Sequence, residues 1–282
     1  MNPVERLRYI SQARGADPTL VAAEAAGALI DLASVAPEGL VTACRRLIER
    51  NVALGPLWWL SARMLRAADP AQEGADAAEQ LDADPTASCL ADLLDGVGAA
   101  VVVGWPDLIA GALRACGDIE VLVVDWDSQG AGFVRRLSDW GCVATLVSPS
   151  GAATAAVVAD VVLVEALAAG PGGVVATPGS LGVAATAAHR RVPVWAVAGV
   201  GRTLPGAMWD SLVECLDNSG LEPWDRPAEV VPADLLSFVV GPRGVWGSPD
   251  GQTSTLASGV AAALGSSTCP VAPELLRIWE RQ

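Results

Sequence analysis

Glu165 is the residue of this 282-residue chain that is best placed for acid–base chemistry, because it directly follows the apolar run at residues 161–164. A carboxylate at a strand end can exchange a proton with a substrate, or it can cap a neighbouring helix by accepting backbone N–H groups. The chain has a single histidine, His189, late in a predicted helix, and no lysine. This composition argues against a zinc site and rules out a lysine Schiff base and a P-loop lysine.

Three turns could present backbone N–H groups to an anionic ligand, as helix N-termini do in many proteins. They are Gly172-Gly173, Gly179-Ser180 and Gln129-Gly130. Arg202, in the loop at residues 199–205, is the best cation for such a ligand, and a surface salt bridge is its structural alternative. Asp107 is predicted to cap the helix that follows Pro106.

Composition and charge limit the partners. The formal net charge of −14 argues against binding to nucleic-acid phosphates, which depends on clustered cations. Six cysteines without a CxxC pair are expected to be buried free thiols. No apolar run approaches the roughly 20 residues of a membrane span, and the first ten residues carry charges where a signal peptide would be apolar. We therefore expect a cytoplasmic protein that contacts no membrane and needs no cofactor or metal.

Residues 1–88 are predicted to form a small helical domain. Apolar residues recur at helical spacing over residues 18–34, 37–50 and 52–67. Trp58 and Trp59 are expected to seal this bundle against its neighbour, with ligand stacking as the alternative. The acidic, alanine-rich stretch at residues 69–88 has little to bury and is predicted to be a linker or a mobile helix.

Residues 89–245 are predicted to form a Rossmann-like, doubly wound α/β domain with a mainly parallel sheet. Apolar runs indicate buried parallel strands at residues 99–103, 120–124, 143–147, 161–164, 192–197 and 235–240. Helices are predicted at residues 107–116, 130–140 and 150–159. Ligands bind such sheets beyond the carboxyl ends of the strands, so we expect a ligand-binding mouth formed by Gly104, Gln129, Glu165 and Ser180. Either Trp105 or Trp126 could plug this mouth.

Residues 246–282 form a tail beyond these elements. Its last segment is predicted to be a helix that docks through Leu275, Leu276, Ile278 and Trp279.

Four collinear segments carry a resemblance to a known family. They are residues 51–65, residues 125–136, the pair ADVVLVEA and GGVVATPGSLGVAATAAHRRVPVWAVA, and residues 228–245. Their order resembles the superfamily that contains the α, β and δ subunits of initiation factor 2B, methylthioribose-1-phosphate isomerase and ribose-1,5-bisphosphate isomerase. The resemblance implies a helical N-terminal domain, a Rossmann-like C-terminal domain and a homodimer formed through the latter. It also implies a catalytic cysteine and a catalytic aspartate at strand ends.

The sequence departs from the family at both catalytic positions. Gly104 and Trp105 stand where the family has its cysteine, and Trp105 would fill the space of a sugar. Ala166 stands where the family has its aspartate. In the phosphate-handling positions, Ala176-Thr177 replaces an Asn-Lys pair and Trp126-Asp127 replaces an Arg-Pro pair. An anionic ligand would lose its cationic contacts there.

Three functional classes follow. The first, which these departures favour, is a non-catalytic homodimeric member of the family that binds a partner protein or a phosphorylated small molecule. The ligand-binding residues would be Gly104, Trp105, Gln129, Gly130, Glu165, Gly172, Gly173, Gly179, Ser180 and Arg202. The second is an aldose-1-phosphate to ketose-1-phosphate isomerase with a changed site that uses Glu165 and His189. The third, a role in translation initiation, rests on the family name alone.

Overall fold

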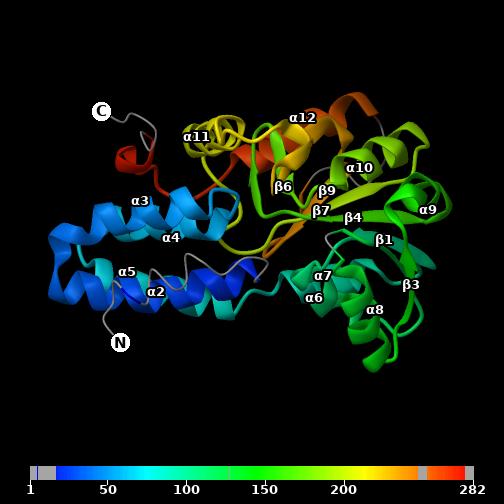
Figure 1. The fold of residues 1–282 in the computed structure, drawn as a ribbon, viewed down its shortest axis with the longest axis horizontal. Helices are drawn as coiled ribbons and strands as arrows, with labels where there is room; N and C mark the ends of the chain where they lie inside the picture. The colour runs from blue at the N-terminus through cyan, green and yellow to red at the C-terminus, as the bar shows by residue number, and fades with distance from the viewer. Residues whose placement is uncertain (1–4, 6–16, 127, 247–252, 277–282) are drawn as a thin grey trace.

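The computed structural model of this chain describes Glu5 and residues 17–126, 128–246 and 253–276. Figure 1 shows a bundle of helices from the N-terminal third beside a larger part built on a twisted sheet. The bundle consists of α2 (Pro18–Val35), α3 (Leu40–Arg50) after the 3-10 turn Pro37–Gly39, α4 (Gly55–Arg66) and α5 (Pro70–Asp82). The helices predicted at residues 18–34, 37–50 and 52–67 are confirmed.

Helix α2 begins at a capped end and is the centre of the bundle. The Asp17 carboxylate accepts a hydrogen bond from the Thr19 backbone N–H at 2.8 Å, which satisfies a free donor of the first turn. Its length and composition would allow it to cross a membrane. Here it packs against α4 and α5, and Val21, Leu29 and Leu32 are buried among their side chains. The helix therefore serves as a core element of this bundle.

The stretch predicted to be a linker is a helix in most of its length. Asp69 caps α5 with hydrogen bonds from the N–H groups of Ala71 and Gln72. Gly74, Ala77 and Leu81 are buried where α5 packs on α2 and α4. Of the two alternatives predicted for this segment, a linker or a mobile helix, the structure has a helix, and it is packed against the bundle. Small side chains suggested a linker, because they bury little area yet allow helices to approach closely.

The main sheet has seven strands in the order β10-β9-β7-β4-β1-β2-β3, all parallel except β10. The strands are β1 (Ala99–Val103), β2 (Glu120–Val124), β3 (Val143–Val147), β4 (Val161–Glu165), β7 (Val194–Val197), β9 (Phe238–Gly241) and β10 (Gly244–Trp246). A smaller antiparallel sheet contains β5 (Ala168–Gly170), β6 (Gly173–Ala176) and β8 (Glu229–Pro232). The predicted α/β fold with a mainly parallel sheet is confirmed.

Helices cover both faces of the sheet (Figure 1). They are α6 (Thr86–Leu93), α7 (Asp107–Leu113), α8 (Gly130–Asp139), α9 (Ala152–Val158), α10 (Ser180–His189), α11 (Gly206–Asp217) and α12 (Thr253–Gly265). Ala100 and Val102 of β1 pack with α6, α7 and α8, whereas Val101 and Val103 pack with α9, α10 and α12. Successive residues of a buried strand thus enter opposite cores, as a doubly wound sheet requires.

Three predictions about the sheet need correction. Strand β3 is an edge strand, with Val143 60% and Leu146 45% exposed, although its apolar run predicted burial. Leu235 ends a 3-10 turn, and β9 starts only at Phe238. The glycine-rich turn at Gly172-Gly173 belongs to a hairpin, because β5 and β6 pair on either side of it.

The tail joins both parts of the molecule. Helix α12 packs against β5 and β9 of the two sheets. Leu275 then lies fully buried in the core that the bundle shares with α11, and Arg45 Nε donates a hydrogen bond to the Glu274 carbonyl at 2.7 Å. Leu276 is partly buried beside Leu275, and the described part of this segment is the 3-10 turn Pro273–Leu275. Ile278 and Trp279 lie outside the described residues, so the docking helix stays a prediction.

Candidate functional site

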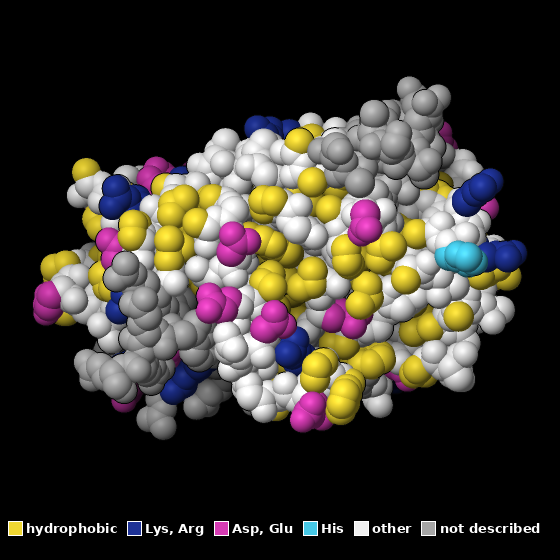
Figure 2. All heavy atoms as spheres, turned by 90° about the horizontal axis from the view of Figure 1, so that it is seen from above, with side chains coloured by type: hydrophobic (Ala, Val, Ile, Leu, Met, Phe, Trp, Pro, Cys, Tyr) yellow, Lys and Arg dark blue, Asp and Glu magenta, His cyan; other side chains and the backbone are white. Residues whose placement is uncertain are grey.

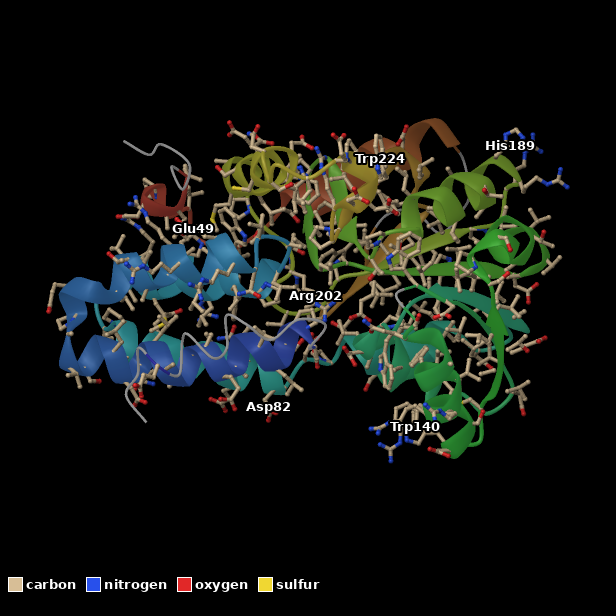
Figure 3. All side chains as sticks on the ribbon, in the orientation of Figure 1. Glu49, Asp82, Trp140, His189, Arg202 and Trp224 are labelled. Atoms are coloured by element: carbon tan, nitrogen blue, oxygen red, sulfur yellow. The ribbon has the colours of Figure 1, made fainter. Side chains whose placement is uncertain are left out.

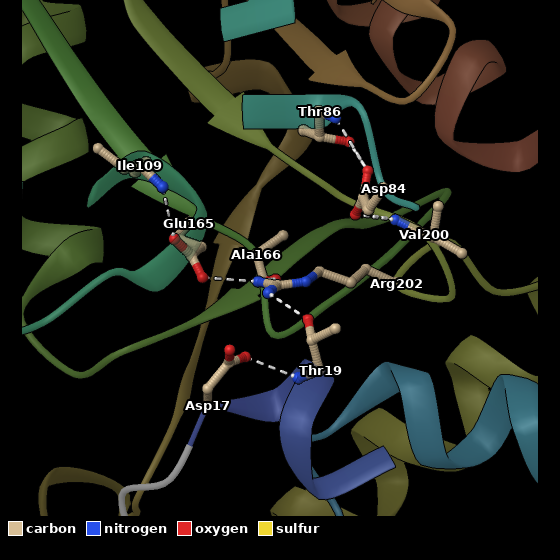
Figure 4. A network of polar contacts seen from close by, with 9 residues as sticks. All are labelled: Asp17, Thr19, Asp84, Thr86, Ile109, Glu165, Ala166, Val200 and Arg202. Atoms are coloured by element: carbon tan, nitrogen blue, oxygen red, sulfur yellow. Dashed lines mark hydrogen bonds and ion pairs between the residues drawn. The ribbon is translucent and has the colours of Figure 1, made fainter. Parts of the chain in front are cut away.

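Glu165, at the end of β4, is held in an ion pair rather than left free as a base (Figure 4). Its Oε1 accepts a hydrogen bond from Nη1 of Arg202 at 2.8 Å, and its Oε2 accepts one from the backbone N–H of Ile109 at 3.1 Å. The side chain is 8% exposed. Glu165 therefore caps the first turn of α7, which is the structural alternative stated for it from the sequence.

Arg202 is a buried cation, although a surface position was expected for its salt bridge. Its side chain has no exposed surface, and Nη1 also donates to the carbonyl of Ala166 at 2.7 Å. Nη2 reaches Oγ1 of Thr19 on α2 at 3.5 Å, so the guanidinium links the sheet to the helical bundle (Figure 4). A charge buried this deeply depends on its partner, and Arg202 is not available to an incoming anion.

Asp107 does not cap α7 as predicted. The N-cap position is Pro106, no side chain of that turn makes a capping bond, and the cap comes instead from Glu165 on β4. The pKa of the Asp107 carboxyl is raised to about 7: burial is the main cause, the nearby charges of Glu165 and Asp17 add to the rise, and Arg202 opposes it. Asp107 is thus a group at this edge that titrates near neutral pH. Its place four residues after β1 was the sequence signal for it.

The N-termini of α8 and α10 are also closed by carboxylates of the chain itself. The N–H of Gly130 at the start of α8 donates to Oδ1 of Asp125 at 2.9 Å. The N–H of Leu181 in α10 donates to Oε1 of Glu229 at 2.6 Å. Burial raises the pKa of Glu229, while the hydrogen bonds from Leu181 and Gly179 lower it. An anionic ligand would have to displace these carboxylates to reach the helix N-termini.

Two tryptophans flank this edge. Gly179 has φ of +94° and lies against the Trp126 ring. A Cβ added at Gly179 would be only 3.1 Å from Cε3 of that ring. Trp105 packs on α8, where its ring centroid lies 5.5 Å from that of Phe133. Trp126 therefore covers the start of α10, whereas Trp105, expected to fill the sugar space, is directed to α8.

The remaining predicted site residues divide into two groups. Gly104 lies beside Thr177, with a distance of 3.4 Å from a virtual Cβ to Thr177 Cγ2, and Ser180 is buried at the start of α10. Gly172 and Gly173, in contrast, pack against Trp209 and the strand β8, away from this edge.

Two further sequence candidates, Gln129 and His189, do not contribute a functional group here. Gln129 is exposed at the N-cap of α8 and makes no capping bond through its side chain. His189 is exposed at the last residue of α10, far from Arg202 (Figure 3). Asp127 lies outside the described residues. Within the described ranges, no three His, Cys, Asp or Glu side chains are grouped to hold a metal ion.

Sequence comparison gives no relative: no family model matches this chain, and no curated protein matches it either. Solved structures do match. The translation initiation factor eIF-2B of Pyrococcus horikoshii OT3 superposes with a TM-score of 0.72 at 15% identity, covering 86% of this chain and 96% of that one. The tetrameric eIF2B-beta2-delta2 complex of Chaetomium thermophilum gives a TM-score of 0.69 at 15% identity, with 93% and 94% of the two chains covered.

An enzyme also has a similar structure, with a lower TM-score. The 5-methylthioribose 1-phosphate isomerase of Pyrococcus horikoshii OT3 gives a TM-score of 0.63 at 16% identity, covering 91% of this chain and 87% of that one. The resemblance drawn from the sequence is thus confirmed at the level of structure: this chain has the fold shared by initiation factor 2B subunits and 5-methylthioribose 1-phosphate isomerase.

Proposed function

We propose that this protein is a non-catalytic relative of these isomerases and acts by binding a partner protein, as a cytoplasmic homodimer. One observation carries the proposal: Glu165, Asp125 and Glu229 occupy the N-termini of α7, α8 and α10, where the sheet would otherwise receive an anionic substrate. Loss of the thiol at Gly104 and of the carboxylate at Ala166 supports the same conclusion. The six cysteines are free thiols, which fits a reducing compartment.

A turnover assay tests the absence of catalysis. Purified protein is incubated with methylthioribose 1-phosphate and, separately, with ribose 1,5-bisphosphate, and the ketose product is measured. No product above the uncatalysed rate is expected. Turnover by the native protein that is lost in Glu165→Gln would contradict the proposal.

The homodimer is proposed to form through the α/β part. The apolar stretch around residues 195–209 is mostly internal, since Trp209 is 4% exposed and Trp195 packs on Phe238. The loop that follows α11 instead exposes Trp224 at 76% and Leu221 at 48%. Figure 2 shows hydrophobic side chains over the middle of one face with carboxylates among them, and Figure 3 places Trp224 along the upper side of the molecule. A large exposed aromatic side chain of this kind is typical of an interface anchor.

A changed isomerase is the alternative, and Asp107 is the observation that favours it. A carboxyl with a pKa of about 7 can both donate and accept a proton at neutral pH. This alternative predicts ketose formation with a rate midpoint near pH 7 that disappears in Asp107→Asn. His189 would take no part, because it is exposed at the far end of α10.

A further inference from the structure

A groove runs between the helical bundle and the α/β part, beyond the ends of β7 and β9. It consists of two adjoining cavities of about 220 Å³ and 440 Å³ that share Trp59, Gln80 and Thr268. The walls come from α4, α5, the loop after β7, the turn between β9 and β10, and the segment after α12. Segments distant in the sequence thus meet at one concave surface.

The groove is cationic in an otherwise acidic protein. Arg63 and Arg66 of α4 and Arg243 of the β9–β10 turn line it, and Glu73 is the carboxylate among its lining residues. The chain as a whole has a formal net charge of −14. A concave surface of the opposite sign concentrates small anions from solution.

The three arginines are not equivalent. Arg63 is ion-paired with Glu73, donates to Oε1 of Gln80 at 2.8 Å and lies over the Trp59 ring at 4.6 Å. Arg66 and Arg243 are exposed, and neither forms an ion pair within the part of the chain that the structure describes. Arg243 lies over the Trp246 ring at 5.1 Å, which leaves its N–H groups at the ring edge open to a ligand. Arg66 lines the larger cavity and Arg243 the smaller one, so the two guanidinium groups without an ion-pair partner lie in different cavities of the groove.

The walls also indicate what kind of molecule would fit between Arg66 and Arg243. Trp59 is 7% exposed, with Arg63 over its ring and Gly201 against it, which leaves no open face for an aromatic ligand. Gln80 and Thr268 border both cavities and offer an amide and a hydroxyl group. A polar, non-aromatic body would match these groups.

We propose that this groove binds a small molecule with an anionic group at each end, phosphate or carboxylate, and a hydroxyl-bearing body between them. Arg66 binds one anionic group and Arg243 the other. Glu165, Asp107 and Glu229 do not line the groove, so the proposal does not depend on whether these residues catalyse a reaction.

Isothermal titration calorimetry with fructose 1,6-bisphosphate as the probe tests this proposal. Binding is expected, with affinity that falls as salt rises. Glucose 6-phosphate, which has one phosphate, should bind at least about ten-fold more weakly, since each charge-assisted contact contributes on the order of a factor of ten. Fructose should not bind. No detectable binding of the bisphosphate at millimolar concentration, or equal affinity for the two phosphates, would overturn the proposal.

Substitutions locate the probe. Arg66→Gln and Arg243→Gln should each weaken bisphosphate binding at least about ten-fold. Both side chains are exposed, so the fold should tolerate either change. Arg135→Gln, at another exposed arginine on α8, is the matched control and should leave the affinity unchanged. Equal affinity in all four proteins would place the probe elsewhere and contradict the assignment.

Discussion

The pair of Glu165 and Arg202 shows how a residue placed for chemistry serves structure instead. Its two charges are almost fully removed from water, and each is held by backbone groups as well as by the other. Removing one member of a buried pair leaves the other charge uncompensated, which is far more destabilising than losing an exposed pair. The role of Glu165 should therefore be visible in stability rather than in turnover.

Glu165→Gln should lower the free energy of unfolding by about 3 kcal/mol, because Arg202 would stay buried without its counter-charge. Urea denaturation of the native and variant proteins measures this. Asp217→Asn removes the carboxylate of the exposed pair with Arg226 and should change the free energy by less than about 1 kcal/mol. Similar losses in the two variants would contradict the structural role of Glu165.

Asp107 should make stability fall with rising pH. The folded protein keeps this proton up to a pKa of about 7, whereas the unfolded chain releases it near 3.8. The folded state therefore binds more protons between these values, and its stability decreases as pH rises through that window. Asp107→Asn should raise the free energy of unfolding at pH 8 by on the order of 1–2 kcal/mol, a value reduced for partial solvent exposure. Urea denaturation at pH 4 and pH 8 tests this; an unchanged pH dependence in the variant would refute it.

Single residues were predicted unevenly from the sequence. Glu165 could be placed at a strand end because the apolar run before it is continuous. Its partner Arg202 could not be identified, since it is 37 residues away and depends on how the loop after β7 returns to β4. Asp107 was assigned as a local cap, but the cap of α7 comes from Glu165, which is 56 residues after Ile109, the residue whose N–H it accepts. The roles of these residues are set by contacts between segments distant in the sequence, which a local sequence pattern does not reveal.

At the scale of elements, carboxylates of the chain itself accept hydrogen bonds from the first turns of α7, α8 and α10. The carboxylate on α10 comes from Glu229, on a neighbouring strand 48 residues away in the sequence. Because a carboxylate and an external anion compete for the same N–H groups, removing Glu229 should create an anion site at this helix.

Glu229→Ala should lower the free energy of unfolding by about 1 kcal/mol through loss of the cap. Sodium sulfate, compared with sodium chloride at equal ionic strength, should then raise the melting temperature of the variant more than that of the native protein. Asp160→Ala is a control, since Asp160 accepts N–H groups of Gly98 and Ala99 that precede a strand. Equal responses of all three proteins to sulfate would contradict the competition.

Elements themselves were largely predictable, and the exceptions have physical causes. Strands β1, β2 and β3 were predicted at their observed bounds because short β-branched runs are typical of parallel strands. The burial of β3 was wrong, because position in the sheet is set by topology and not by the strand's own sequence. The small sheet of β5, β6 and β8 was missed, since its strands are short and rich in alanine and glycine.

For the whole molecule, the helical bundle and the α/β part are joined by polar contacts as well as by a shared core. Arg202 reaches Thr19, and Asp84, ahead of α6, accepts the N–H of Val200 at 2.8 Å (Figure 4). Leu275 of the tail completes the core between the bundle and α11. The loop after α11 lies outside these links and exposes Trp224 and Leu221.

Trp224→Asp should convert the proposed dimer into a monomer at micromolar concentration, because a charge would replace an apolar anchor. Its melting temperature should change little, since the side chain is exposed. Leu146→Asp, on the exposed edge strand β3, is the matched control and should stay dimeric. Sedimentation velocity measures both masses. A monomeric native protein, or dissociation by Leu146→Asp alone, would contradict this interface.

The central claim is that the chain's own carboxylates occupy the place of an anionic substrate. A crystal structure of the protein soaked with ribose 1,5-bisphosphate tests it most directly. We expect Glu229 to remain bonded to the N–H of Leu181, Glu165 to remain paired with Arg202, and no phosphate at the start of α7, α8 or α10. A phosphate group bound at the start of α10, with Glu229 displaced, would contradict the account.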